Sequence, residues 1–270
     1  MKVSISNIAW NMDEQEEVLS LLDQNNIKGI EIAPTKFWEN PLDCDTDTLV
    51  EFKRDWDRKG IQLVAMQSLL FGQNTLSLFT TKKAREKMTS YLKGIISLAG
   101  QIGIEALVFG SPKNRVAGNL SKSERFNIAV PFFEDLAEYA LNKNVFFCIE
   151  PNPIHYGCDF ITNSDEGIEL VQAVNHQGFQ LHLDAGTLSL NNENVEEVIE
   201  KSSPYLKHFH ISEPFLDKVS TGVSPHHRIA KALKSSGYQR WVSIEMRNEP
   251  EQSNVSNVEQ ALTFALETYA

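Results

Sequence analysis

The sequence predicts an α/β fold, namely a single (β/α)8 TIM barrel formed by residues 1–270. Short apolar segments typical of strands alternate with amphipathic segments typical of helices along the whole chain. The chain length of 270 residues also matches one such barrel. An open doubly wound sheet is the alternative, but the turn after the first expected strand reads AWNMDE and lacks its glycine-rich sequence.

The expected strands are short and rich in branched and aromatic apolar residues, and they cover 3–10, 27–33, 61–67, 106–111, 145–150, 179–184, 206–212 and 241–245. The expected helices follow them at 12–26, 45–60, 82–103, 121–144, 164–175, 194–205, 226–238 and 257–270. Gly60 is expected to end the second helix in the left-handed conformation. Pro131 is expected to kink or break the fourth helix.

The composition limits the class of protein and its partners. The chain has 36 acidic and 25 basic residues and a formal charge of -11, which disfavours binding to nucleic acid or to an anionic membrane. No apolar run approaches the roughly 20 residues of a membrane span, and the N-terminus does not read as a signal peptide. The 3 cysteines lack a CxxC spacing, which indicates reduced thiols. We therefore expect a cytoplasmic protein, and the sequence leaves its oligomeric state open.

Four expected strands in the second half each end on a side chain that can bind a metal ion: Glu150, Asp184, His210 and Glu245. Successive side chains of a strand point to opposite faces. One face of each of these strands is apolar, and the other is mixed and becomes polar at the carboxyl end. Because active sites of α/β barrels are built at that end, the pattern predicts a functional site there.

The residue types at these strand ends favour a metal site. Each residue alone is also explained as a hydrogen-bonded polar group at a strand terminus. Together, however, three carboxylates at one barrel mouth would repel one another without a cation. Three carboxylates and one imidazole suit one divalent ion such as Mn²⁺, Mg²⁺ or Co²⁺, with Zn²⁺ as a further option.

Such a site is suited to proton transfer on a small sugar-like substrate. A hydroxyl and an adjacent carbonyl of the substrate would chelate the ion, which polarises the carbonyl and stabilises an enediolate. Glu150 and Glu245 come from well-separated strands and can act as acid and base on opposite faces of the substrate. This chemistry predicts an epimerase or isomerase of a sugar or sugar phosphate. A dehydratase of a polyol or keto-acid, and a non-catalytic sugar-binding barrel, remain alternatives.

Further polar residues near the barrel mouth are candidate substrate contacts: Glu31, Gln67, Lys113, Arg115, His182 and Arg247. Lys113, Arg115 and Arg247 would hold a phosphate or carboxylate of the substrate, although a solvated loop also explains the first two. His182 and His208 lie deeper on their strands. For both, a hydrogen bond to a metal ligand is favoured over direct ligation.

The sequence around these positions resembles a known superfamily. The motifs EPNP, LDAGT, HFHIS and GYQRWVSIEM surround the four strand-end residues, and HHRIAKALKSSGYQRWVSIEM is the most specific segment. Together they resemble the xylose-isomerase-like TIM-barrel superfamily of sugar and sugar-phosphate isomerases and epimerases. The resemblance implies that Glu150, Asp184, His210 and Glu245 bind the metal ion, and that Glu150 and Glu245 also transfer protons.

The chain departs from two subgroups of that superfamily. Ketose 3-epimerases carry a glutamate, a histidine and an arginine where this chain has Tyr156, Thr187 and Leu216. The substrate contacts of that subgroup are therefore not transferred to this chain. The three-zinc endonucleases use additional histidines on early strands, where this chain has Glu31 and Gln67, and its acidic charge also disfavours a nuclease.

Overall fold

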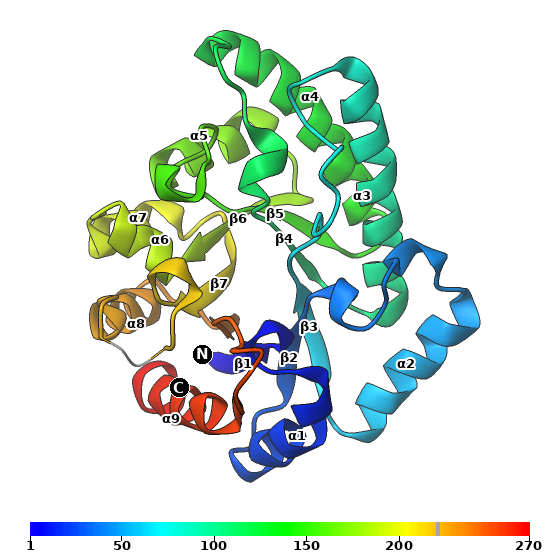
Figure 1. The fold of residues 1–270 in the computed structure, drawn as a ribbon. Helices are drawn as coiled ribbons and strands as arrows, with labels where there is room; N and C mark the ends of the chain where they lie inside the picture. Colours follow the sequence, from blue (N-terminus) through cyan, green and yellow to red (C-terminus); the bar gives the residue numbers. More distant parts are fainter. Residues whose placement is uncertain (220–221) are drawn as a thin grey trace.

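The computed structural model describes residues 1–219 and 222–270, and its parallel strands close into a barrel in sequence order (Figure 1). The strands are β1 Lys2–Ser6, β2 Gly29–Ile32, β3 Gln62–Met66, β4 Ala106–Phe109, β5 Phe146–Ile149, β6 Phe179–Asp184, β7 Leu206–Ser212 and β8 Trp241–Glu245. Parallel pairing of β1 with β8 closes the barrel. The predicted (β/α)8 barrel is confirmed.

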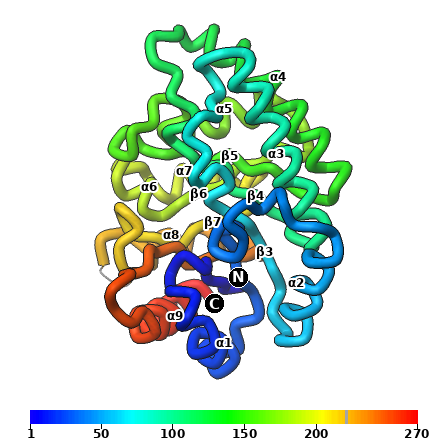
Figure 2. Tube along the Cα trace, turned by 45° about the vertical axis from the view of Figure 1, so that its right-hand side comes forward, coloured from blue at the N-terminus to red at the C-terminus, as the bar shows by residue number. Residues whose placement is uncertain are grey.

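Helices surround this barrel (Figure 1). They are α1 Gln15–Gln24, α2 Thr46–Arg58, α3 Lys82–Ile102, α4 Lys122–Leu141, α5 Ser164–Val174, α6 Ala185–Leu190, α7 Val195–Ser202, α8 His226–Ser235 and α9 Val255–Tyr269. The short helix α6 was not expected from the sequence. Figures 1 and 2 both show the two chain termini near each other, because the last helix, α9, packs beside β1.

Local chemistry explains where several elements end. Gly60 follows α2 with φ +68°, so the expected left-handed cap is confirmed. The first strand is shorter than expected because Ser6 and Asn7 bond to backbone groups, and Asn7 Oδ1 accepts from Ala33 N at 2.7 Å. The expected break at Pro131 does not occur, since α4 continues through this residue although proline lacks the helical N–H donor.

The strands separate apolar from polar side chains as their alternation predicts. Phe147, Phe209 and Ile244 are fully buried in the core between the sheet and the helices. Polar residues occupy the barrel interior, where Glu31 and His182 are likewise fully buried. Parallel strands of a barrel are covered on both faces, so these interior polar groups need partners within the protein.

Among the described residues, no helix is both long enough and apolar enough to cross a membrane.

Candidate active site

A cavity of about 410 Å³ opens at the carboxyl end of the barrel. It is lined by residues at or just beyond the ends of β3 to β8, including Gln67, Glu150, Asp184, His210, Glu245 and Arg247. The cavity therefore lies where the loops that follow the strands can shape a binding site.

The four strand-end residues converge at the bottom of this cavity. Ligand atoms of Glu150, Asp184, His210 and Glu245 all lie within 4.8 Å of one another. Asp184 and Glu245 are the last residues of β6 and β8, and Glu150 directly follows β5. His210 pairs with Asp184 in the β6–β7 register, so the two side chains lie at the same level of the barrel. We call these four residues the mouth layer.

Two of the mouth-layer carboxylates are held by amide side chains. Gln67 Nε2 donates to Glu245 Oε1 at 2.5 Å, and Asn152 Nδ2 donates to Glu150 Oε2 at 3.0 Å. Gly110 leaves space for Glu150, because a Cβ atom at this position would collide with the Glu150 carboxylate. These contacts fix each carboxylate while leaving its other oxygen free to bind a ligand.

Asp184 joins the site to the element that follows it. Its Oδ1 caps α6 by accepting from Thr187 N at 2.7 Å, and its Oδ2 accepts from Ser212 Oγ. Burial, together with the charges of Glu245 and Glu150, raises the pKa of Asp184 to about 7. The raised pKa reflects the cost of bringing three carboxylates together, a cost that a bound cation would remove.

His210 presents its two ring nitrogens to different partners. Its Nδ1 lies 3.1 Å from Glu245 Oε2 and 3.7 Å from Glu150 Oε1, and it makes no hydrogen bond to any described residue. Its Nε2 faces Glu31 below the cavity. Burial lowers the pKa of His210, but the charges of Glu31 and Glu245 raise it well above its usual value.

This donor set fits the predicted divalent ion. Three carboxylates and one imidazole nitrogen face a common point, and the imidazole Nδ1 is buried without a hydrogen bond in the part of the chain that the structure describes. Such oxygen-rich sites with one nitrogen suit Mn²⁺, Mg²⁺, Co²⁺ or Zn²⁺. Glu150, Asp184, His210 and Glu245 would hold the ion.

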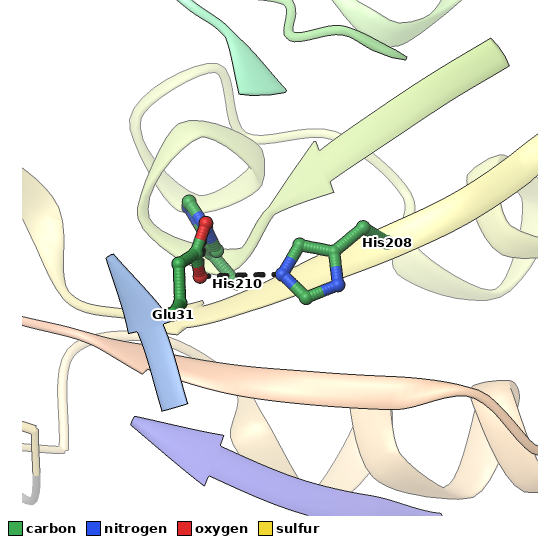
Figure 3. A group of neighbouring side chains, drawn as sticks. All are labelled: Glu31, His208 and His210. Atoms are coloured by element: carbon green, nitrogen blue, oxygen red, sulfur yellow. Dashed lines mark hydrogen bonds and ion pairs between the residues drawn. The ribbon is translucent and has the colours of Figure 1, made fainter. Parts of the chain in front are cut away.

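A second set of polar residues lies beneath the mouth layer and is closed to solvent. We call Glu31, His182 and His208 the lower layer; their exposed fractions are 0 to 2%. Glu31 of β2 contacts both histidines of β7 (Figure 3), since its Oε2 lies 3.2 Å from His208 Nε2 and 3.0 Å from His210 Nε2. Burial raises the pKa of Glu31, but the charges of His210 and His208 lower it well below its usual value.

His182 lies two residues before Asp184 on β6, so its side chain points into the barrel one level below that of Asp184. Its Nε2 lies 3.4 Å from Glu150 Oε1. Burial and the charge of His210 lower the pKa of His182 to about 3, so this imidazole is neutral. Neither His182 nor Glu31 lines the cavity, although both were predicted to contact substrate. A substrate in the cavity would contact the mouth-layer residues and not Glu31 or His182.

The other predicted substrate contacts differ in their access to the cavity. Gln67 and Arg247 line it. Lys113 is exposed and does not belong to the lining. Arg115 is fully buried because the short helix Pro112–Arg115 turns it inward, where its Nη2 donates to the backbone oxygen of Glu150 at 2.6 Å. Arg115 thus supports the end of β5.

The positions that differ from ketose 3-epimerases all line the cavity, namely Tyr156, Thr187 and Leu216. The backbone N–H of Phe215, which also lines it, donates to the Tyr156 hydroxyl at 2.8 Å. The two rings pack edge to face with centroids 5.6 Å apart. Burial raises the pKa of Tyr156 to about 12, so its hydroxyl stays protonated. Tyr156, Phe215 and Leu216 therefore form an apolar wall of the cavity.

Several of these residues were missed from the sequence. Ser212 carries a detectable signal, because it lies two residues after His210 and so shares its inward direction. Asn152 lies in a loop and Phe215 in the single 3-10 turn Pro214–Leu216, where no periodic pattern indicates the direction of a side chain.

Comparison with known proteins agrees with this architecture. The chain belongs to the family described as xylose isomerase-like TIM barrel, whose model matches residues 19–267. A Synechocystis protein named "Probable ketose 3-epimerase" is 26% identical over 261 residues, which cover 92% of this chain and 85% of that protein.

Two solved structures share the fold over the whole chain. D-psicose 3-epimerase from Clostridium cellulolyticum with D-tagatose has a TM-score of 0.82 and 17% identity, covering 100% of this chain and 99% of that chain. IolI protein with a bound zinc atom has a TM-score of 0.77 and 19% identity, covering 100% and 98%. At these identities the two structures establish the fold alone. The relative in sequence is named as an epimerase, and the prediction that this chain is an enzyme is confirmed.

Proposed function

We propose that the protein is a divalent-metal-dependent epimerase or isomerase of a sugar with a carbonyl next to a hydroxyl-bearing carbon. The convergence of all four mouth-layer ligand atoms within 4.8 Å is the observation that carries this proposal. A bound divalent ion would polarise the substrate carbonyl and stabilise the charge of an enediolate. The 26% identity to a protein named as a ketose 3-epimerase supports the same class of reaction.

The two glutamates are proposed to move the proton, while Asp184 and His210 only hold the ion. Glu150 and Glu245 follow β5 and end β8, so β6 and β7 separate them around the barrel and they approach a substrate from different sides. Burial raises the pKa of Glu150, but the neighbouring rings of His182 and His210 lower it below its usual value. An ionised Glu150 is ready to accept the substrate proton, and Glu245 would return one.

An unphosphorylated sugar is the proposed substrate. Within residues 1–219 and 222–270, Arg247 is the one arginine or lysine of the cavity lining. The charge of a bound divalent ion is offset by the three carboxylates, so a substrate phosphate would find little further positive charge in the lining. The apolar wall of Tyr156, Phe215 and Leu216 instead suits contact with the C–H groups of a sugar.

Mn²⁺, Mg²⁺ or Co²⁺ is the proposed ion, because the mouth layer is rich in oxygen. Zn²⁺ is the alternative, and a zinc atom is bound in the IolI structure. The cytoplasm remains the predicted compartment.

Exchange of the substrate proton with solvent tests the reaction class. Metal-free protein is loaded with Mn²⁺ and incubated in D₂O with a panel of ketoses and aldoses, and unloaded protein serves as the control. Deuterium at the carbon next to the carbonyl of the recovered isomer is the expected result. Loss of water from the substrate would indicate a dehydratase instead. Tight sugar binding without exchange of any proton would indicate a binding protein.

A second measurement tests the charge of the substrate. We expect a higher kcat/KM for an active ketose than for the same ketose with a terminal phosphate. Arg247→Gln is expected to raise KM because Arg247 lines the cavity, whereas Lys113→Gln, outside the lining, is the matched control. A clear preference for the phosphorylated sugar that depends on Lys113 would contradict the proposed substrate.

A further inference from the structure

We infer that Glu31 is a positioning residue, which orients the His210 imidazole and keeps its proton on Nε2 so that Nδ1 is free to bind the ion. The inference rests on the proposed metal-dependent function and names the role of a residue that does not line the cavity. It concerns ion binding by this chain, so it can be tested without a substrate.

The geometry places Glu31 against one nitrogen of His210 only. Its Oε1 and Oε2 lie 3.1 and 3.0 Å from His210 Nε2, although 179 residues separate the two positions in sequence. His210 Nδ1 points to the other side, 3.1 Å from Glu245 Oε2. The imidazole thus spans the lower layer and the mouth layer, with one nitrogen in each.

The hydrogen-bonding capacity of the groups determines where the proton lies. An ionised carboxylate only accepts hydrogen bonds, and a neutral imidazole carries one N–H donor. A histidine that binds an ion is neutral, so its one N–H must be at Nε2 to satisfy Glu31, and the lone pair on Nδ1 is the one that meets the ion. A carboxylate in this position also makes the imidazole a stronger base and therefore a stronger ligand.

The local backbone directs Glu31 into this position. The pairing of β2 with β3 shifts register between Ile30 and Glu31, and such irregularities re-aim side chains next to functional sites. Glu31 is fully buried and would be costly without partners. His208 Nε2, at 3.2 Å from Oε2, supplies a second contact. If Glu31 had only a structural role, its hydrogen bonds would stabilise the fold without affecting ion binding. The experiment distinguishes this role from the positioning of His210.

Two variants of Glu31 test separately its negative charge and the length of its side chain. Glu31→Gln keeps the size but replaces one acceptor oxygen with an N–H donor, so it no longer dictates the position of the His210 proton. Glu31→Asp keeps the charge but withdraws the oxygens from Nε2. The matched control is Ser243→Ala, since Ser243 is fully buried, pairs with His210 in the β7–β8 register, and its hydroxyl has no partner among the described residues.

Ion affinity is measured on metal-free protein by titration with Mn²⁺, with thermal unfolding as a check on the fold. We expect Glu31→Gln to weaken Mn²⁺ binding about 10- to 100-fold, Glu31→Asp to weaken it less, and Ser243→Ala to leave it unchanged. The second readout is the ¹⁵N spectrum of the histidine side chains in the Zn²⁺-loaded protein. It should show His210 protonated at Nε2 in the wild type and altered in Glu31→Gln.

The outcomes separate this inference from the proposed function. Wild-type affinity and an unchanged His210 spectrum in a folded Glu31→Gln or Glu31→Asp variant would overturn the role of Glu31 and leave the metal site intact. If Glu31→Gln does not fold, Glu31→Asp decides on the same two readouts. A wild-type protein that binds neither Mn²⁺ nor Zn²⁺ would overturn the metal-dependent function, and the role of Glu31 with it.

Discussion

The mouth layer and the lower layer both consist of carboxylates and imidazoles, but only the mouth layer has ligand atoms that are accessible from the cavity. The mouth layer lines the cavity and keeps ligand atoms directed at a common point. The lower layer is closed to solvent and is engaged with the residues above it. His182 and His208 precede Asp184 and His210 by two positions, so each pair shares one face of its strand. The position of a residue along its strand, more than its type, therefore determines whether its side chain lines the cavity or supports a residue that does.

The largest effect is expected from the mouth-layer glutamates. Glu150→Gln and Glu245→Gln each remove a proton-transfer group and should lower kcat by about 10²- to 10⁴-fold. Thermal unfolding should change little, because both residues lie at strand ends. The measurement is kcat at saturating Mn²⁺, and Glu39→Gln, at an exposed loop position, is the control. Near-full activity in either variant would refute the two-glutamate mechanism.

A smaller effect is expected for the ligand that does not move protons. Asp184→Asn should weaken Mn²⁺ binding about 10- to 100-fold, because an amide replaces a charged ligand. The helix α6 should persist, since asparagine caps helices as well as aspartate does. Calorimetric titration of metal-free protein measures the affinity, with Asp13→Asn at an exposed position as the control. Unchanged affinity would exclude Asp184 from the site.

The pH dependence of ion binding tests the charge repulsion within the mouth layer. The pKa of Asp184 is about 7 without an ion, so below pH 7 the ion must displace a proton from this carboxyl. Because the pKa of the ligand His210 is also raised, the ion displaces a second proton there, so Mn²⁺ affinity should rise with pH by about tenfold per pH unit for each proton that is released. Titrations between pH 5.5 and 8.5, roughly, span this transition. A flat profile would contradict the raised pKa.

The same raised pKa affects the stability of the metal-free protein. The folded-state pKa of Asp184 lies above its ordinary value of 3.8, so its stabilising contribution is complete below that value and is lost as the pH rises through about 7. The raised pKa of His210 acts in the same direction. Metal-free protein should therefore melt at a lower temperature at about pH 8 than at about pH 6, and saturating Mn²⁺ should remove the difference.

The smallest change in ion binding is expected from a lower-layer residue that does not contact a mouth-layer carboxylate. His208→Phe removes one partner of Glu31 and should lower the free energy of unfolding by about 1 to 3 kcal/mol. Mn²⁺ affinity should change less than in Asp184→Asn, because Glu31 keeps its contact with His210. Urea unfolding and titration measure the two effects. Equal losses of affinity in both variants would remove the distinction between the layers.

The two layers were predictable to different degrees. The inward direction of Glu150, Asp184, His210 and Glu245 follows from the two-residue period of a strand, which is a local property. Their convergence follows from parallel strands in one barrel, where equivalent ends meet at one mouth. The contact between Glu31 and His210 depends on the register of strands that are distant in the sequence, and no local pattern reports it.

The predicted roles of the loop residues show a similar limit. Lys113 and Arg115 were expected to face the same mouth, but Arg115 turns inward to the backbone of Glu150 and Lys113 stays outside the cavity lining. The direction of a side chain in a loop depends on backbone angles that have no period. Asn152, which holds Glu150, was missed for the same reason.

The sequence by itself determined the barrel and the residues placed at its mouth, because strand and helix periods and the alternation of side chains are encoded within each segment. The tertiary structure decided which polar residues line the cavity and which are sealed beneath it. It did so because barrel closure and strand register bring together side chains from strands that are distant in the sequence, as with Glu31 of β2 and His210 of β7. The depth at which each group meets its partners decides whether it is free to bind an ion.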